Sequence, residues 1–429
     1  MIELLLGLYF FAGITILAWG FRRPPRMLQF PFLAAGVFMG WMLPQLLGLS
    51  GYANWPRGAL EKTIAMAALC MCGCWVGYVL NRRRARLLDW EFGRRRLLTA
   101  SAILSGAGAI FFYLVGQLAP DVIAAHGGAW TGIITIYVFL GRLLAVGFCI
   151  ALVLHLEHPT RTTIAIVLFG LAFYLHRILI LGRRAATAEL VLMVLMALWF
   201  QRRWLPSRGV MASVLIAGTL LINSIGDYRN TMLGDDRYSW SGAGLNAILD
   251  IDYAGNLKRI AEGRQGNFSL TNALYEIEAA DRTLEFDYGM SLWNGLVQRI
   301  VPGQFVGAEV KQALFLDRRR SAGGVFGHEA HTGSTLTGIT DAFQSFWFFG
   351  AIKIVLIGFI MNRWNRAAQI VLMLCVTASL HAITHTTNHF FLAFFDIVVF
   401  LVPVLLYARV AKRPDISGRE VLREARSLG

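Results

Sequence analysis

The chain consists mostly of long apolar runs that alternate with short polar stretches, and one polar stretch is far longer than the others. That stretch covers the 114 residues from Asp227 to Thr340. A helix needs roughly 20 apolar residues to cross a hydrocarbon core about 30 Å thick. The pattern therefore predicts eleven membrane-spanning helices. They are expected at residues 2–20, 27–49, 63–80, 98–118, 130–154, 162–181, 187–200, 209–226, 341–361, 368–386 and 390–408.

Basic residues are divided unequally between the two sets of short connections. One set holds 22 Lys and Arg, and the other holds 4. The richer set comprises 21–26, 81–97, 155–161, 201–208, 362–367 and the segment from 409 onward, and the poorer set comprises 50–62, 119–129, 182–186 and 387–389. Lys and Arg near the ends of spans mark the cytoplasmic side. We therefore expect the N-terminus and the long polar stretch outside, and the C-terminal tail in the cytoplasm.

Composition supports this organisation. The chain has 56% hydrophobic and 15% charged residues and a mean hydropathy of +0.55, which excludes an ordinary water-soluble protein. The expected fold class is an all-α, polytopic helical bundle with one large external loop. Its expected parts are helices 1–8 at 1–226, the loop at 227–340, helices 9–11 at 341–408 and a basic tail at 409–429. The net charge of +14 then reflects topology, and no nucleic-acid partner is expected.

The large external loop contains two segments with a helical pattern. Apolar residues recur at three- and four-residue spacings in 272–282 and 291–300, which is typical of amphipathic helices. Such helices can lie along a membrane surface. We expect them to cover a cavity between the spans. All five cysteines fall inside predicted spans, so we expect no disulfide in this loop.

Several charged residues fall inside the predicted spans, and four of them are considered together. Arg142 and Lys353 lie near the middle of their spans, and Glu189 and Asp396 lie nearer the ends of theirs. A charge near the bilayer centre costs about 2.5–3.5 kcal/mol, so such a residue is a candidate for function. Two basic and two acidic groups can equally form structural ion pairs between helices. Both interpretations are open for each of the four residues.

A basic cluster lies where the sixth predicted span meets the seventh. His176 and Arg177 close the first of these spans, and Arg183 and Arg184 form the turn into the next. An anionic headgroup at the outer membrane surface would meet several guanidinium groups here, and each can hold phosphate oxygens through two parallel hydrogen bonds. The alternative is ordinary anchoring, in which the arginines snorkel to the lipid headgroups.

Topology and several short motifs point to a known family. The chain has many spans, an external arginine turn and a large external loop before the last spans. The motifs are Tyr288-Gly-Met-Ser-Leu-Trp293, Arg299-Ile-Val-Pro302 and Thr335-Leu-Thr-Gly338, followed by Asp341, Ala342, Phe346 and Phe349-Gly350. Over residues 160–360 these features resemble the Wzy-type polymerases of bacterial surface polysaccharide (O-antigen or exopolysaccharide). Asp341 is a departure, because such sequences often have a glutamate there.

The resemblance implies a GT-C glycosyltransferase in the bacterial inner membrane, with its large loop in the periplasm. Such a polymerase moves a growing glycan from undecaprenyl pyrophosphate onto the sugar of another lipid-linked repeat unit. The expected partners are undecaprenyl-pyrophosphate-linked oligosaccharides and membrane lipids, together with a flippase and a chain-length regulator. The resemblance implies neither a metal nor any other cofactor.

The reaction implied by the resemblance needs fixed positive charge near the departing pyrophosphate and a base for the acceptor hydroxyl. Seven residues are expected to bind substrate: Arg177, Arg183, Arg184, Arg229, Arg282, Arg299 and His385. Four residues are expected to be catalytic: His328, His331, Glu276 and Asp287.

Three groups of residues can supply the base. The first is His328 with His331, either of which Glu329 could orient. The second is the set of loop carboxylates: Glu276, Glu278, Asp281, Glu285 and Asp287. The third is His381, His385 and His389, which share one helix face at i, i+4 and i+8. This third group can line a polar cavity or bind zinc, although no carboxylate or cysteine accompanies it nearby.

Two other functions fit the same topology. An O-antigen ligase would pass the glycan to a lipid A core. A lipid-linked sugar transporter or flippase would carry its substrate across the bilayer, and transporters commonly have repeated halves and broken helices at the midplane. A cavity that opens only outward, beneath the large loop, would favour the transferase over the transporter.

Overall fold

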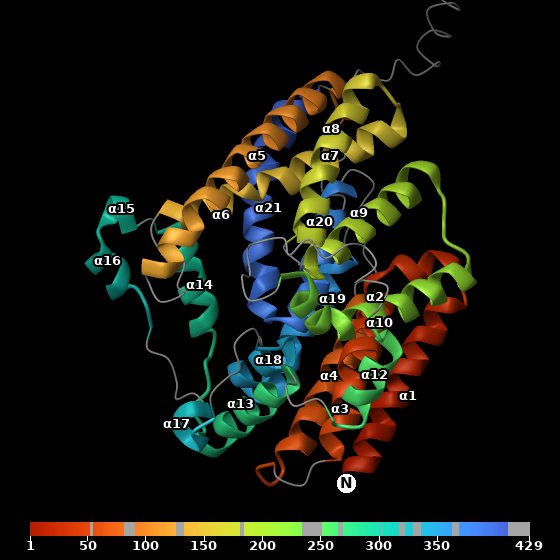
Figure 1. The fold of residues 1–429 in the computed structure, drawn as a ribbon, viewed down its shortest axis with the longest axis vertical. Coiled ribbons are helices and arrows are strands. Elements are labelled where there is room, and N and C mark those ends of the chain that lie inside the picture. The colour runs from red at the N-terminus through yellow and green to blue at the C-terminus, as the bar shows by residue number, and fades with distance from the viewer. Residues whose placement is uncertain are drawn as a thin grey trace, which may run out of the picture.

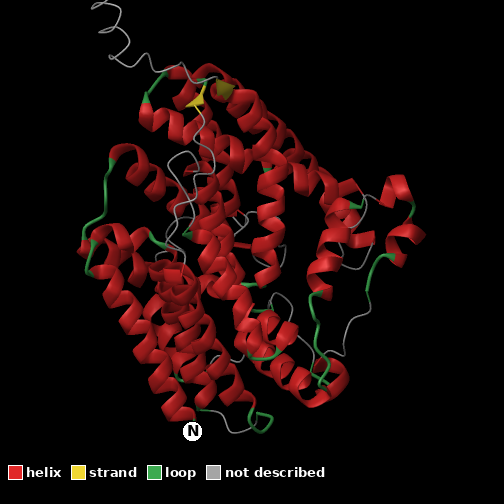
Figure 2. Ribbon diagram, turned by 180° about the vertical axis from the view of Figure 1, so that it is seen from behind, coloured by secondary structure: helices red, strands yellow, loops and turns green. Residues whose placement is uncertain are grey.

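Nearly all of the described chain in the computed structural model is helical (Figure 2). The structure describes residues 1–51, 55–80, 91–125, 133–180, 184–233, 251–264, 269–301, 303–316, 322–328, 336–362 and 369–410. Within these residues, eight helical stretches are long and apolar enough to cross a membrane. They are Ile2–Phe21, Phe30–Ser50, Ala59–Leu80, Arg94–Leu118, Ile133–Glu157, Arg161–Leu179, Gly338–Met361 and Thr387–Ala408. Arg208–Ser224 and Gln369–Thr384 are shorter apolar helices.

The expected all-α, multi-pass membrane architecture is therefore confirmed. Each of the eleven predicted spans falls mainly on helix where the structure describes it, with short non-helical breaks inside some of them, such as those at Arg142 and Trp347. The predicted span at 187–200 falls on α9 (Arg184–Arg202), which is not among the eight membrane-length stretches. Eleven crossings and a GT-C fold remain predictions.

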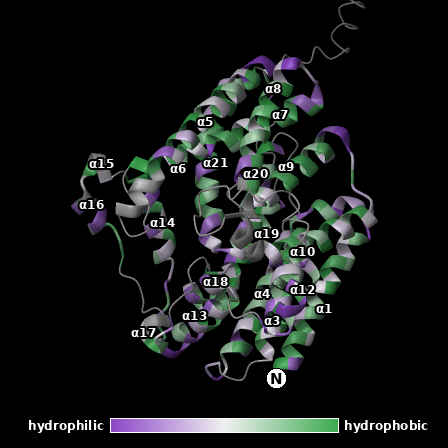
Figure 3. Ribbon diagram, in the orientation of Figure 1, coloured by the Kyte–Doolittle hydropathy of each residue, from purple (hydrophilic) through white to green (hydrophobic). Residues whose placement is uncertain are grey.

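Six of these apolar stretches belong to continuous helices: α1 (Ile2–Phe21), α4 (Ala59–Leu80), α5 (Arg94–Ala125), α10 (Arg208–Leu233), α20 (Gln369–Thr384) and α21 (Thr387–Ala408). The long helices, such as α1 and α5, are mostly apolar, whereas hydrophilic residues gather on α12 (Tyr253–Ala261) and α16 (Ala308–Ala313) of the loop (Figure 3). This contrast is expected for helices that face lipid and helices that face water.

Four membrane-length stretches change conformation partway along. The 3₁₀ turn η1 (Pro24–Leu28) leads into α2 (Phe30–Val37), the π-helical η2 (Phe38–Met42) and α3 (Leu43–Ser50). The helix α8 (Arg161–Leu175) continues as the π-helical η3 (His176–Ile180). The helices α6 (Ile133–Gly141) and α7 (Leu143–Glu157) meet at Arg142. The helices α18 (Gly338–Phe346) and α19 (Ile352–Met361) are separated by Trp347, with φ +56°, and by η4 (Phe349–Ala351). Interruptions of this kind recur at functional sites.

The helices α4 and α19 pack with their backbones unusually close. A Cβ atom on Gly77 would lie 2.0 Å from the carbonyl oxygen of Val355, and one on Gly358 would lie 2.6 Å from that of Cys74. Small residues permit such close approach between helices in membranes, where dispersion contacts replace the hydrophobic driving force. This contact fixes the position of α19, including its first residues, which follow the break between α18 and α19.

Both predicted amphipathic segments of the loop are helices. They are α13 (Ser269–Thr283) and α14 (Met290–Ile300), accompanied in the loop by α12, α15 (Gly303–Val306), α16 and α17 (Ala322–Phe326). The helix α14 packs along α21 (Figure 1), and its position relative to the membrane surface stays a prediction. Gly295 lies against Leu392, and one turn later Arg299 reaches Asp396. The two helices therefore run side by side in the same direction.

Connections predicted for the same side of the membrane lie together. Arg94 donates a hydrogen bond to the carbonyl of His158 at 2.8 Å, and Arg208 donates one to that of Arg22 at 3.3 Å. The short strands β1 (Glu91–Phe92) and β2 (Arg409–Val410) pair antiparallel and join the start of α5 to the end of α21. These segments all belong to the arginine-rich set. Lys62 and Trp55, in the arginine-poor set, contact Glu278 and Tyr275 of the large loop.

Candidate functional site

Two arginines from distant parts of the chain share one buried aspartate. The Nη1 atom of Arg299 donates to the carboxylate oxygens of Asp396 at 2.6 and 2.7 Å and to the carbonyl oxygen of Leu392 at 2.9 Å. Arg142, at the junction of α6 and α7, donates to the same carboxylate. Only 5% of the Asp396 side chain is exposed. A buried carboxylate requires such partners, since leaving it unpaired is strongly destabilising.

This arrangement carries a surplus of positive charge. Two guanidinium groups face one carboxylate, and 38% of the Arg142 side chain remains exposed, against 18% for Arg299. Each guanidinium has five N–H donors, more than these contacts use. Burial and the nearby Arg142 lower the pKa of Arg299, and Asp396 opposes the shift. An added anion would therefore find both unsatisfied donors and uncompensated charge.

Three histidines lie on the same side of α21 as this aspartate. The Nδ1 of His381, near the end of α20, lies 3.0 Å from the Nε2 of His389, in the first turn of α21. The His385 ring centre lies 5.4 Å from that of His381 and 5.9 Å from that of His389. His389 and Asp396 are seven residues apart, so they share a helix face and lie about 10 Å apart along the axis.

His385 lies in the turn between α20 and α21 and is unusually placed for a histidine. Its Nδ1 atom is buried and has no hydrogen-bond partner among the described residues. Burial lowers the pKa of His385, and the negative charge of Asp341 partly offsets this effect. The imidazole is therefore neutral at neutral pH and can accept a proton. In the part of the chain that the structure describes, no group of three His, Cys, Asp or Glu is arranged to hold a metal ion, so the zinc alternative gains no support.

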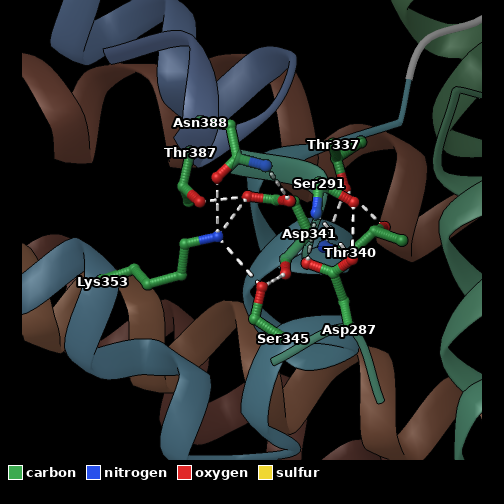
Figure 4. A network of polar contacts seen from close by, with 9 residues as sticks. All are labelled: Asp287, Ser291, Thr337, Thr340, Asp341, Ser345, Lys353, Thr387 and Asn388. Atoms are coloured by element: carbon green, nitrogen blue, oxygen red, sulfur yellow. Dashed lines mark hydrogen bonds and ion pairs between the residues drawn. The ribbon is translucent and has the colours of Figure 1, made fainter. Parts of the chain in front are cut away.

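The buried Lys353 bonds across the break between α18 and α19 (Figure 4). The Nζ of Lys353 donates to Asp341 at 2.9 Å, to Ser345 at 3.0 Å and to Asn388 at 3.0 Å. Thr387 and Asn388 also donate to the Asp341 carboxylate. The network joins α18, α19 and the first turn of α21. It therefore fixes the turn that carries His385 and His389.

A second charged cluster ties the loop to the transmembrane helices. Lys62, at the start of α4, forms ion pairs with Glu278 and Asp281 of α13. Arg282 pairs with Glu278 at 2.8 Å and lies over the ring of Phe326. These contacts balance the charges of the cluster among themselves. No described contact joins Arg282 to Arg299, and its role in substrate binding stays a prediction.

The predicted catalytic residues that the structure describes lie around α13 and α18, and no described contact joins them to Asp396. The His328 ring stacks on Tyr275 with centres 4.1 Å apart, and its Nε2 lies 2.8 Å from the Oδ1 of Asn272. Glu276 accepts a hydrogen bond from Gln344 at 2.8 Å. Asp287 lies three residues before α14 and accepts hydrogen bonds from the backbone and hydroxyl of Ser291. His331 lies outside the described residues.

Of the predicted substrate-binding residues, Arg299 and His385 lie near the shared aspartate and the other histidines. Arg177 instead pairs with Glu189 at 3.7 Å and lies over the ring of Tyr174. Arg183 lies outside the described residues, as do the side chains of Arg184 and Arg229. The external arginine turn therefore remains a prediction.

Sequence reasoning noted Arg142 and Asp396 as charges inside spans but did not assign them to the site. Their pairing with Arg299 could not be read from the sequence, because 97 residues separate Arg299 from Asp396 and 254 separate Arg142 from Asp396. One signal in the sequence could have indicated these pairs. Placing a charge inside a span costs free energy, so each such charge is expected to have a partner of opposite charge. The sequence also placed His389 on a helix face shared with His381 and His385, but only His385 was predicted to bind substrate.

A cavity of about 460 Å³ lies between the arginine-rich ends of α5, α7, α9, α20 and α21. Its lining residue Gln369 is twelve residues from His381 on α20, about 18 Å along the helix. It is therefore not the outward-opening cavity expected beneath the loop.

Comparison of the chain with known proteins gives no match to a protein-family model, to a curated protein or to a solved structure.

Proposed function

We propose that this protein is a membrane glycosyltransferase that polymerises oligosaccharide repeat units linked to undecaprenyl pyrophosphate, in the manner of the Wzy-type polymerases. One observation carries the proposal: Arg142 and Arg299 share Asp396 on the α21 face that also carries His389. The surplus positive charge suits a pyrophosphate, whose oxygens accept paired hydrogen bonds from guanidinium groups. The neighbouring imidazoles supply a proton acceptor.

The chemistry of transfer assigns a role to each group. The acceptor hydroxyl oxygen forms a bond to the anomeric carbon of the donor glycan, and the bond from that carbon to the phosphate oxygen breaks. The electron pair leaves with the pyrophosphate, where Arg142 and Arg299 stabilise the developing charge. The hydroxyl proton passes to a histidine of the cluster formed by His381, His385 and His389. We favour this cluster over His328, because His328 is stacked and hydrogen-bonded at α13.

The origin of the two arginines supports a reaction on the outer side. Arg299 belongs to α14, a helix of the large polar loop, and Arg142 belongs to the break between two transmembrane segments. A substrate held between them would contact the loop and the membrane helices together. A lipid-linked oligosaccharide suits both surroundings. Its glycan is hydrophilic and can contact the loop, whereas its polyprenyl tail requires an apolar path between membrane helices.

One observation favours a transporter as the second candidate. Asp396 is nine residues after the start of α21, about 13 Å along a helix that would cross a core about 30 Å thick. The ion pair is then near the middle of the span, and the chain is broken beside it at Arg142. Transporters place substrates at broken helices near the midplane. A ligase shares the transferase chemistry and differs in its acceptor.

Reconstitution separates these functions. The purified protein is placed in liposomes with lipid-linked oligosaccharides extracted from a strain that lacks it. A polymerase produces a ladder of glycans that differ by one repeat unit. A ligase produces glycan on added lipid A core and no ladder. A flippase exposes labelled substrate on the opposite leaflet without changing its mass, and that result would overturn the proposal.

A further inference from the structure

The cavity at the arginine-rich ends of the helices has no role in the proposed reaction, and its lining is both apolar and polar. Its floor is apolar and buried, formed by Leu97, Ile150, Val153, Leu154, Ile370 and Leu405. Its rim carries Phe92 and five polar residues: Arg94, Glu157, His158, Gln201 and Gln369. A volume of about 460 Å³ is within the range of pockets that hold small ligands. An amphipathic molecule would match both the floor and the rim.

The charged residues of the rim occur as a pair of opposite sign. Arg94 and Glu157 are both exposed, and within the described residues neither forms an ion pair with a neighbour. Arg94 donates one hydrogen bond, to the carbonyl oxygen of His158, which leaves further N–H groups of its guanidinium for a ligand. An anionic ligand would satisfy Arg94 but would be repelled by Glu157. A ligand with one anionic and one cationic group would satisfy both.

Other features of the rim agree with a lipid headgroup. Gln201 donates to the side-chain oxygen of Gln369 at 2.7 Å, so the pair still offers an acceptor on Gln201 and a donor on Gln369. The β1–β2 pairing brings Phe92 next to Arg409, which places another basic residue near the mouth. Pockets between membrane helices on the side rich in basic residues are suited to phospholipid headgroups.

We propose that this cavity binds an aminophospholipid, with the phosphate at Arg94, the primary ammonium at Glu157 and an acyl chain along the apolar floor. The site is distinct from the Arg142–Arg299 pair and does not depend on the transferase assignment. It places a lipid contact where α5, α7, α9, α20 and α21 meet, so occupancy would hold these helix ends together.

Native mass spectrometry of the full chain tests the proposal. The detergent-purified protein is mixed with phosphatidylethanolamine, phosphatidylcholine and phosphatidylglycerol that have identical acyl chains. Phosphatidylcholine keeps the positive charge but cannot donate hydrogen bonds from it, and phosphatidylglycerol lacks a cation. We expect one phosphatidylethanolamine to be retained with roughly tenfold preference over each of the others.

Two variants with matched controls identify the residues. Glu157→Gln should remove the preference for phosphatidylethanolamine over phosphatidylglycerol, and Arg94→Ala should weaken retention of all three lipids. The controls are Glu91→Gln and Arg161→Ala, exposed residues at the same end that do not line the cavity, and both should leave retention unchanged. Glu157→Gln keeps the proposal testable if Arg94→Ala fails to fold. Equal retention of the three lipids by the parent chain, or an unchanged preference in Glu157→Gln, would overturn it.

Discussion

Arg299 and Asp396 are hydrogen-bonded at 2.6 and 2.7 Å although 97 residues separate them in the sequence. The arginine belongs to the polar loop and the aspartate to a membrane-length helix. Their ion pair therefore attaches the loop to the bundle at the depth of Asp396. Arg142 joins the same carboxylate from a third segment. The loop therefore contributes a side chain to the site and does not only cover the membrane helices.

Removing the shared carboxylate should damage folding more than removing one arginine. Asp396→Ala leaves two neighbouring guanidinium groups without their counter-ion, and we expect a loss of about 3–5 kcal/mol in the free energy of unfolding. Arg299→Ala leaves Asp396 with Arg142, so its effect on stability should be smaller. Unfolding followed by circular dichroism in detergent provides the comparison. A larger loss in Arg299→Ala than in Asp396→Ala would contradict the shared pairing.

Lys353 should be essential for the structure of the helix break. Its ammonium contacts Asp341, Ser345 and Asn388. Lys353→Met removes the positive charge and leaves the buried Asp341 without its ion-pair partner, so we expect destabilisation by about 3–5 kcal/mol. The double variant Lys353→Met with Asp341→Leu should recover much of this loss. Thermal unfolding of the parent chain, both single variants and the double variant measures the coupling, and additive losses would contradict it.

The close contact between α4 and α19 predicts a strong effect of a single methyl group. A Cβ on Gly77 would lie 2.0 Å from the Val355 carbonyl oxygen, so Gly77→Ala must push the helices apart and should cost about 1–3 kcal/mol. Gly7→Ala is the matched control, because nothing lies within 4 Å of its added Cβ. Melting temperatures of the two variants test this directly. Equal melting temperatures would mean that the helices are not in this contact.

Stability should fall on acidification, in part because of His385. Burial lowers its pKa in the folded chain, so the unfolded chain takes up this proton at a higher pH than the folded chain does. The resulting contribution to stability is present above about pH 6.5 and is lost as the pH falls below that value. His385→Gln should reduce the difference between melting temperatures at pH 7.5 and 5.5.

Sequence reasoning reached the helical architecture because apolar runs of membrane length have few alternatives. It also located the helices α13 and α14 by their periodicity. It could not place α14 against α21, since that contact depends on Gly295 fitting beside Leu392 and on Arg299 meeting Asp396. The same limit applied to His328, a candidate base in the sequence, whose stacking on Tyr275 could not be predicted. Partners far apart in the sequence leave no periodic signal.

The rate of glycan ladder formation by Arg142 and Arg299 variants tests the central claim most directly. Each Ala variant should lower the rate by about 10²–10³, because one fixed donor to the departing pyrophosphate is lost. Lys at either position should recover only part of the rate, since an ammonium cannot reproduce the guanidinium fork. Arg264→Ala, at an exposed loop arginine, is the control and should retain the full rate. Full activity in folded Arg142→Ala and Arg299→Ala proteins would contradict the account.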